Sequence, residues 1–414
     1  MASPSKIKEF RFKVGTTHNT AFTNGAAAGW NAVDYTATKL RVVAYDDSGL
    51  TQDGLPDETL QTRMHAQDAH IAGLRKGTIK VTSYAGAAYT NLAVAPEINI
   101  ARACMGGLQS AATGRTTAIA AGTSTTINAL VASATGYAVA GMAALIGVKG
   151  DGRGNGEVKP INSVTSNSLG LAVACAAAPN ENDAITISDT CYLDEDAAQQ
   201  YVDTYAIGHA TADHRQTIGG AATFTITGMG PGELPKMEIT IAVTDHQYIT
   251  TTGDKSTLTH GSAPRGSDPP YDKGIGLVHV GDHGTSTRTV RKCGALSVTM
   301  GASYEEVPGP HGVNGIVGYQ HMPGVPVAEA TLLMDEDDGL IADFTSQTAK
   351  SVLFQLGHVA GACCAIELPK AYLDALPLPA DLGNLKGLKI TLHGTEDYVA
   401  SNDLRSSAVR VHWF

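Results

Sequence analysis

The chain has 414 residues and a formal net charge of −11, with 17% charged residues, 6% aromatic residues and 46 glycines. This length predicts two or three domains, and low charge with many Gly, Ala and Thr residues is typical of β-rich proteins. The negative charge argues against a protein that reads nucleic acid, because neutralising phosphates requires clustered Lys and Arg, but it is compatible with an acidic wall past which DNA slides.

The first eighty residues predict strands around one long polar segment. Residues 10–14 alternate apolar and basic side chains, which predicts an opening strand, and residues 40–45 and 78–84 predict two more. The intervening residues 46–77 are polar and show little periodicity. We expect a long loop there that is functional or ordered by a partner, because structureless loops of that length are uncommon inside compact domains.

A single helix is predicted over residues 96–108. Pro96 suits a first helical position and Glu97 suits the first turn, where an acidic side chain complements the helix dipole. The glycines at 106–107 weaken its end. Helical spacing places four apolar side chains on one face: Ile98, Ala101, Met105 and Leu108.

Residues 111–194 differ in composition and predict an inserted β-module. The segment is nearly free of charge up to Lys149, and short runs separated by turns rich in Gly, Asn and Asp are typical of a small barrel or sandwich. Its strands are expected at 137–148, 157–164, 169–174 and 184–188. The module would interrupt one β domain, made of residues 1–110 and 195–250, and decorate its outside.

Residues 201–245 predict a three-strand antiparallel meander. Phe224 and Ile226 alternate with threonines, and residues 237–243 alternate apolar and other side chains, as half-buried strands do. Gly and Pro residues between these strands permit or fix turn geometry. Residues 202–207 supply an earlier strand.

The last third predicts a linker followed by a second β domain. Residues 251–284 are rich in Thr, Gly, Ser, Asp and Pro, as connectors are. Residues 285–414 contain further alternating stretches, and residues 346–356 fit the spacing of either a helix or a strand. The chain closes on apolar residues alternating with Arg410 and His412, which predicts a C-terminus tied into a sheet.

An internal duplication is one interpretation of the second half. The sequence at 205–209 is comparable to that at 354–358, Gly220-Ala221-Ala222 to Gly361-Ala362-Cys363, and the strand 237–243 to the strand 388–392. This spacing is far longer than a solenoid repeat. The alternative is two unrelated β-meanders that share generic turns.

The order of elements between Tyr201 and Asp245 resembles the core of the major tail tube proteins of long-tailed bacteriophages. It is a strand ending near a Gly pair, a Thr-rich strand, a Gly-x-x-Pro turn and a strand reading Lys-Met-Glu-Ile-Thr-Ile. The resemblance covers residues 1–110 with 195–250, and more faintly 285–414. It implies an all-β, tail-tube-like sandwich or barrel with a single flanking helix, duplicated, plus the inserted small β-domain.

The resemblance also implies a function and partners. The protein would be a structural virion protein that polymerises as stacked rings to form the tail tube, through which phage DNA passes without specific binding. A duplicated chain would form trimeric, pseudo-hexameric rings, whereas a chain with one tube unit would form hexamers. A tape measure protein, a tail terminator and assembly in the cytoplasm of the host bacterium are also implied, with no membrane partner.

Two other classes of function compete with this interpretation. A virion-surface or adhesin-type β-sandwich that binds carbohydrate or a receptor would also be acidic and rich in Gly and Thr, but it should display an aromatic platform, and aromatics are few. A secreted hydrolase would need a signal sequence or a carboxylate cleft. The N-terminus has no apolar core of signal length, and no apolar run is long enough to cross a bilayer. We therefore expect that the protein is not an enzyme.

Candidate metal sites fail on spacing. The acidic run 335–339 lacks the alternate ligands and distal Glu of a calcium loop. The segment 151–157 places Arg153 where an oxygen ligand is needed and predicts a hairpin turn. His65 and His70 do not form a zinc-binding HExxH motif. The six cysteines lack CxxC spacing, which favours reduced, buried thiols in a protein made in the cytosol.

Candidate catalytic motifs fail in the same way. His279 and His283 flank Asp282, but no GxSxG nucleophile elbow accompanies them. Lys255-Ser256 lacks the glycine-rich approach of a phosphate-binding loop. We predict no catalytic, cofactor-binding or metal-binding residue.

Overall fold

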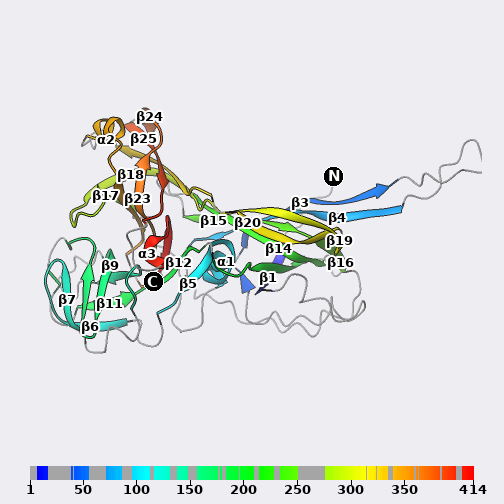
Figure 1. Ribbon diagram of the computed structural model, residues 1–414, viewed down its shortest axis with the longest axis horizontal. Coiled ribbons are helices and arrows are strands. Elements are labelled where there is room, and N and C mark those ends of the chain that lie inside the picture. The colour runs from blue at the N-terminus through cyan, green and yellow to red at the C-terminus, as the bar shows by residue number, and fades with distance from the viewer. Residues whose placement is uncertain are drawn as a thin grey trace, which may run out of the picture.

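The structure is mainly β. Within the described residues, strands form an 18-stranded sheet, a closed barrel of six strands and a separate two-stranded sheet, and three helices are present. The predicted all-β class is confirmed (Figure 1). The computed structural model describes the chain over residues 7–16, 39–40, 42–55, 71–85, 96–111, 116–130, 138–147, 156–175, 178–179, 183–194, 196–208, 214–227, 234–249, 276–313, 315–322, 324–333, 339–358, 360–361, 363–382, 385–397 and 403–414.

A first unit is built from the N-terminal strands and the predicted meander. Antiparallel pairing runs from β1 to β13, β14, β15, β4 and β3, and β2 pairs with the other side of β1. β16 pairs with the first half of β14. The bounds are β1 (Ile7–Gly15), β2 (Lys39–Leu40), β3 (Val42–Leu55), β4 (Ile71–Tyr84), β13 (Tyr201–Gly208), β14 (His214–Thr227), β15 (Lys236–Val243) and β16 (Asp245–Ile249).

The predicted three-strand meander of 201–245 is confirmed as β13, β14 and β15. Phe224 and Ile226 are buried while the threonines between them are partly exposed, as alternation requires. β14 changes partners at Gly219–Gly220: residues up to Gly220 pair with β13, residues 214–218 also pair with β16, and residues 221–227 pair with β15. Gly219 has φ +63° and donates its N–H to the buried carboxylate of Asp203 at 2.7 Å. Glycine is required there because other residues rarely adopt positive φ.

A second unit repeats this arrangement. Pairing runs from β18 to β21, β25, β23, β22 and β17, and β17 returns to the first half of β18. β24 lies on the far side of β25. The bounds are β17 (Gly276–Asp282), β18 (Thr289–Thr299), β21 (Val327–Leu333), β22 (Lys350–Leu356), β23 (Cys364–Leu373), β24 (Leu378–Leu382) and β25 (Leu385–Gly394).

The strand order of the two units corresponds element by element. β1, β3, β4, β13, β14 and β15 take the same places in the first unit as β17, β18, β21, β22, β23 and β25 in the second. A helix follows the third of these strands in each: α1 (Pro96–Met105) and α2 (Leu340–Ser346). Two unrelated meanders would have no reason to share this order.

The residue-level alignment drawn from the sequence is wrong at one point. Gly220 lies inside β14, where that strand changes partners, whereas Gly361 lies in the turn before β23, with φ +84°. The glycine pair at 219–220 and the single Gly361 therefore have different structural roles. Both sequences contain a glycine near a strand, and nothing in the local pattern shows whether the chain turns there or continues.

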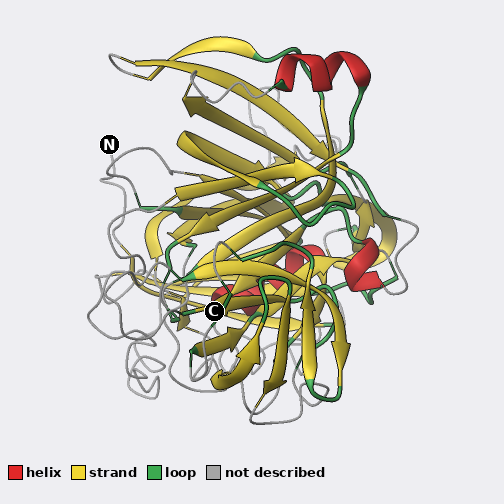
Figure 2. Ribbon diagram, turned by 90° about the vertical axis from the view of Figure 1, so that its left-hand side faces the viewer, coloured by secondary structure: helices red, strands yellow, loops and turns green. Residues whose placement is uncertain are grey.

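The six-stranded barrel is formed by residues 116–187. Its strands close in the order β6, β7, β10, β9, β8, β11 and back to β6 around a separate hydrophobic core (Figure 2). On the outside of the barrel, Leu145 and Val158 pack in one cluster with Leu353, Ala365 and Phe414. The bounds are β6 (Thr116–Gly122), β7 (Thr126–Leu130), β8 (Ala143–Ile146), β9 (Glu157–Thr165), β10 (Ser168–Leu171) and β11 (Ala184–Ile187).

The C-terminal strand joins the parts. β26 (Arg410–Trp413) pairs with β23 on one side and with β12 (Asp189–Leu193) on the other, and β12 also pairs with β5 (Gly106–Gln109). Trp413 is fully buried and donates its indole N–H to the Ala85 carbonyl oxygen at 3.0 Å. The expected C-terminus tied into a sheet is confirmed. A short helix, α3 (Asp403–Ser406), precedes it.

Three local predictions need correction, and one open alternative is resolved. The segment 46–77 is not a loop throughout, because residues 46–55 belong to β3 and residues 71–77 to β4. The linker assignment fails at 276–282, which forms β17. The predicted single helix is one of three, and it ends at Met105 because Gly106, with φ +88°, starts β5. For residues 346–356, where helix and strand were both open, the structure has a strand at 350–356.

Candidate functional site

Each of the two units has a two-stranded arm, and the arms extend from corresponding hairpins of the two units. The first arm is the outer part of β3 and β4, residues 51–55 and 71–76, and it continues past the end of β15, which pairs only with residues 77–84. Arg75 holds its base to β16 through an ion pair with Asp245 at 3.1 Å. In Figure 1 the arm runs out to the right of the other strands.

The second arm is the hairpin of β19 (Ser303–Val313) and β20 (Ile316–Met322), inserted between β18 and β21. It corresponds to the first arm because both interrupt the hairpin between the second and third strands of their unit. A facing glycine pair marks the base of both: a Cβ at Gly77 would overlap the Gly49 carbonyl, and one at Gly324 would overlap the Gly301 carbonyl. Only glycine permits the two backbones to approach so closely.

The second arm folds back on the first unit of the same chain. The Tyr304 hydroxyl lies 2.9 Å from the carbonyl oxygen of Ala103 and 3.2 Å from that of Cys104. These carbonyls belong to the last turn of α1, which has no intrahelical donors for them. Lys76 also pairs with Glu306 at 3.2 Å. The second arm thus covers the end of α1 and supplies a hydrogen-bond donor to the carbonyl oxygens of its last turn.

The two corresponding helices differ in coverage. Eight of the ten residues of α1 are buried, whereas Leu340 is the one buried residue of the seven in α2. Ile341 on α2 is 45% exposed. The surface that the second arm helps to cover on the first unit therefore has an uncovered counterpart on the second unit.

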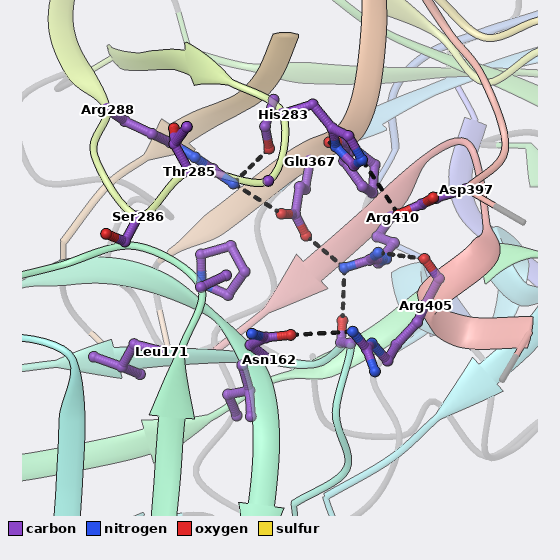
Figure 3. A pocket seen from close by; sticks show the side chains of 17 residues that line it. Asn162, Leu171, His283, Thr285, Ser286, Arg288, Glu367, Asp397, Arg405 and Arg410 are labelled. Atoms are coloured by element: carbon purple, nitrogen blue, oxygen red, sulfur yellow. Dashed lines mark hydrogen bonds and ion pairs between the residues drawn. The ribbon is translucent and has the colours of Figure 1, made fainter. Parts of the chain in front are cut away.

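A pocket of about 290 Å³ lies where the barrel meets the second unit (Figure 3). Its walls come from β9 and β10 of the barrel, from the turn between β17 and β18, from β22 and β23, and from the C-terminal segment. The lining residues that carry its chemistry are Asn162, His283, Thr285, Ser286, Arg288, Ser351, Glu367, Asp397, Arg405 and Arg410.

Glu367 is the centre of a buried charge cluster at the floor of this pocket. Its side chain is 2% exposed and lies 2.9 Å from Arg410 and 3.4 Å from Arg288. Burial alone would raise the pKa of Glu367, but Arg410, His412 and Arg288 together hold it at about 2. The carboxylate is therefore ionised and bridges two guanidinium groups that come from different segments.

The cluster continues as hydrogen bonds into the barrel. His412 is fully buried, with Nε2 3.5 Å from the Glu367 carboxylate and Nδ1 2.9 Å from the Thr190 hydroxyl. Thr190 contacts the Ser188 hydroxyl, which accepts the Ala143 N–H at 2.9 Å. Burial lowers the pKa of His412 despite the neighbouring Glu367. One polar network thus links the second unit, β12 and the barrel.

Arg288 is not fully satisfied by this network. Its side chain is 4% exposed, and one terminal nitrogen, Nη2, donates to the Ser351 hydroxyl at 2.6 Å and approaches Glu367. Its Nε and Nη1 are buried without an acceptor. An unsatisfied buried donor costs about 1–3 kcal/mol, more for a charged group, so this arrangement needs a reason.

The histidines that flank Asp282 do not form a triad. His279 is buried in β17, where burial lowers its pKa to about 4. His283 lies in the pocket wall, with Nδ1 3.0 Å from the Pro369 carbonyl and Nε2 3.4 Å from the Asp397 carboxylate. The Asp282 carboxylate accepts a hydrogen bond from Lys350 at 2.6 Å. The three side chains therefore have separate partners.

The other candidates from the sequence fall mostly outside the described residues. These are His65, His70, Lys255-Ser256, the acidic run up to residue 338 and residues 151–155. Glu157 is described and pairs with Lys159 at 3.1 Å. Among the described residues no cluster of three His, Cys, Asp or Glu could hold a metal ion, and no helix is long and apolar enough to span a membrane. All six cysteines are free, and all but Cys293 are buried.

Sequence reasoning missed the charge cluster. Its members come from positions 288, 367 and 410, and no local spacing connects them. One signal was present: Arg410 and His412 alternate with apolar residues in β26, which predicts a polar face toward solvent, yet every residue of β26 is buried. A polar face on a strand that lies between two other strands is a candidate buried network.

Comparison with known proteins gives no family assignment. No protein-family model matches the chain, and no curated protein matches its sequence at a significant level.

Proposed function

We propose that the protein is a self-assembling structural subunit whose copies join head to tail through the first arm. The observation that carries this proposal is the unequal use of two corresponding arms. The second arm is seated on the first unit of its own chain, at the end of α1. The first arm extends past its sheet, and the corresponding helix α2 has one buried residue.

The repeat gives this contact a direction. The second arm lies on the unit that precedes its own. If the first arm is used in the same way, it also lies on the unit before its own. No unit comes before the first unit within the chain, so the receiving unit would be the second unit of another copy. Such a contact is heterologous, and heterologous contacts produce closed rings or open filaments. A two-stranded ribbon is also marginally stable alone, so a surface that receives it stabilises it.

Within this framework we propose a ring of three chains, in which six units alternate around the axis, and rings that stack into a tube. The resemblance to phage tail tube proteins supplies the biology: a virion tail tube, assembled in the host bacterium, through which DNA passes. The net charge of −11 suits a channel that does not retain DNA. Exposed strand edges are a liability in a monomer, and neighbouring copies would cover them.

Trimming the two arms separately tests the proposal. In one variant a two-residue Asn-Gly turn replaces residues 53–74, and in the other it replaces residues 304–321, which include Tyr304. Removal of the first arm should abolish rings in negative-stain microscopy and leave the monomer's melting temperature unchanged. Removal of the second arm should lower the melting temperature, because α1 loses its cover. Rings that persist without the first arm would contradict the proposal.

A further inference from the structure

We propose that the pocket between the barrel and the second unit binds a small oxyanion, such as phosphate, through Arg288. This inference does not depend on the proposed assembly. It rests on the charge balance of the pocket, on a buried guanidinium with unused donors and on the size of the space.

The pocket carries an excess of positive charge in an acidic protein. Three guanidinium groups line it, from Arg288, Arg405 and Arg410, against two carboxylates, from Glu367 and Asp397. Histidines aside, the count is 3 − 2, or +1, while the whole chain has a net charge of −11. One bound anion would neutralise the pocket.

The donors of Arg288 are positioned before any ligand arrives. Ser351 and Glu367 hold Nη2, which fixes the plane of the guanidinium and leaves Nε and Nη1 without acceptors. In Figure 3 the side chain extends from the turn between β17 and β18 toward Glu367. Glu367 is already engaged by Arg410 at 2.9 Å. Arginine is the preferred partner of phosphate and carboxylate groups because its planar donors match their oxygens.

The size and rim of the pocket favour a small ligand. Its volume of about 290 Å³ lies at the lower end of the range for small-molecule sites. Thr285 and Ser286 are exposed at its rim, so the ligand has access from solvent. Asn162 and Ser351 add polar groups within the walls.

Calorimetric titration of the full chain with inorganic phosphate, at constant ionic strength, tests the site. Wild-type protein should give saturable binding at one site per chain. Arg288→Gln removes the donors, and Ser286→Asp places a negative charge at the rim while leaving Arg288 and the buried cluster intact. Both variants should weaken binding by about tenfold or more, since charge-assisted hydrogen bonds are strong.

Lys386→Gln is the matched control, because it removes one positive charge from an exposed ion pair with Asp381, away from the pocket. It should bind phosphate with wild-type affinity. Ser286→Asp keeps the test decisive if Arg288→Gln fails to fold. Three results would overturn the proposal: no binding by wild-type protein, unchanged affinity in Ser286→Asp, or an equal loss in Lys386→Gln.

Discussion

At the scale of single residues, the charge cluster at Glu367 is the most consequential feature. A buried ion pair adds little stability compared with apolar residues of the same shape, yet removing one partner is costly because it leaves an uncompensated charge. Glu367 neutralises Arg410 and part of Arg288 and contacts His412. Its ion pairs therefore link β23 to β26 and to the segment that connects β17 and β18.

Substitution Glu367→Gln should destabilise the fold by about 3–5 kcal/mol, because two buried guanidinium groups lose their counter-charge. Urea unfolding followed by circular dichroism measures this change. The control Asp381→Asn breaks an exposed pair and should cost less than about 1 kcal/mol. Equal losses of unfolding free energy in the two variants would show that the buried cluster stabilises the fold no more than an exposed ion pair does.

The same carboxylate predicts a pH dependence. Its pKa is about 2 in the folded chain and near the ordinary 4.5 when unfolded, so the unfolded chain takes up the proton first as pH falls. The stabilisation is fully present above pH 4.5 and is lost between about 4.5 and about 2, amounting to about 3 kcal/mol. The free energy of unfolding, measured by urea titration between pH 4.5 and about pH 2, should fall with pH in the wild type. In Glu367→Gln most of this dependence on pH should be absent.

At the scale of elements, the second arm shows how one hairpin stabilises another part of the chain. Tyr304→Phe removes a hydroxyl that serves two carbonyls at the end of α1. We expect a loss of about 1–3 kcal/mol, because those buried acceptors lose their donor. Thermal unfolding measures it. Tyr372→Phe, on a partly exposed tyrosine beside His393, is the control and should change stability by less than about 0.5 kcal/mol.

Which elements the sequence could predict depended on local periodicity. The alternation around Phe224 in β14 and around Ile239 in β15 reports half-buried strands, and the structure has them. The first arm was missed, because residues 46–55 and 71–77 show no regular alternation of apolar and polar side chains from which a strand could be predicted. The charge cluster was missed because tertiary pairing brings Glu367 and Arg410 together.

At the scale of the whole molecule, the repeated strand order explains the shape. Two units of one topology share a continuous core and are joined by pairing of β14 with β18, at Thr225–Thr299 and Ile226–Val298. The barrel is attached beside the second unit (Figure 2). The contact between the second arm and the first unit within one chain is the model for the proposed contact between chains. In that contact the first arm of one copy would lie on the second unit of another.

Ile341→Asp tests that template on the receiving side. It places a charge on the exposed face of α2, so it should prevent association without lowering the monomer's melting temperature. Ile341→Val keeps an apolar side chain there and should assemble like the wild type. Sedimentation velocity distinguishes the two, and normal association of Ile341→Asp would remove α2 from the interface.

Cryo-electron microscopy of the assembled protein tests the central claim most directly. We predict rings in which three chains give six similar units around one axis, with the first arm of each chain on α2 of its neighbour. A dispersed monomer under all assembly conditions, or a ring in which each first arm folds back on its own chain, would contradict it.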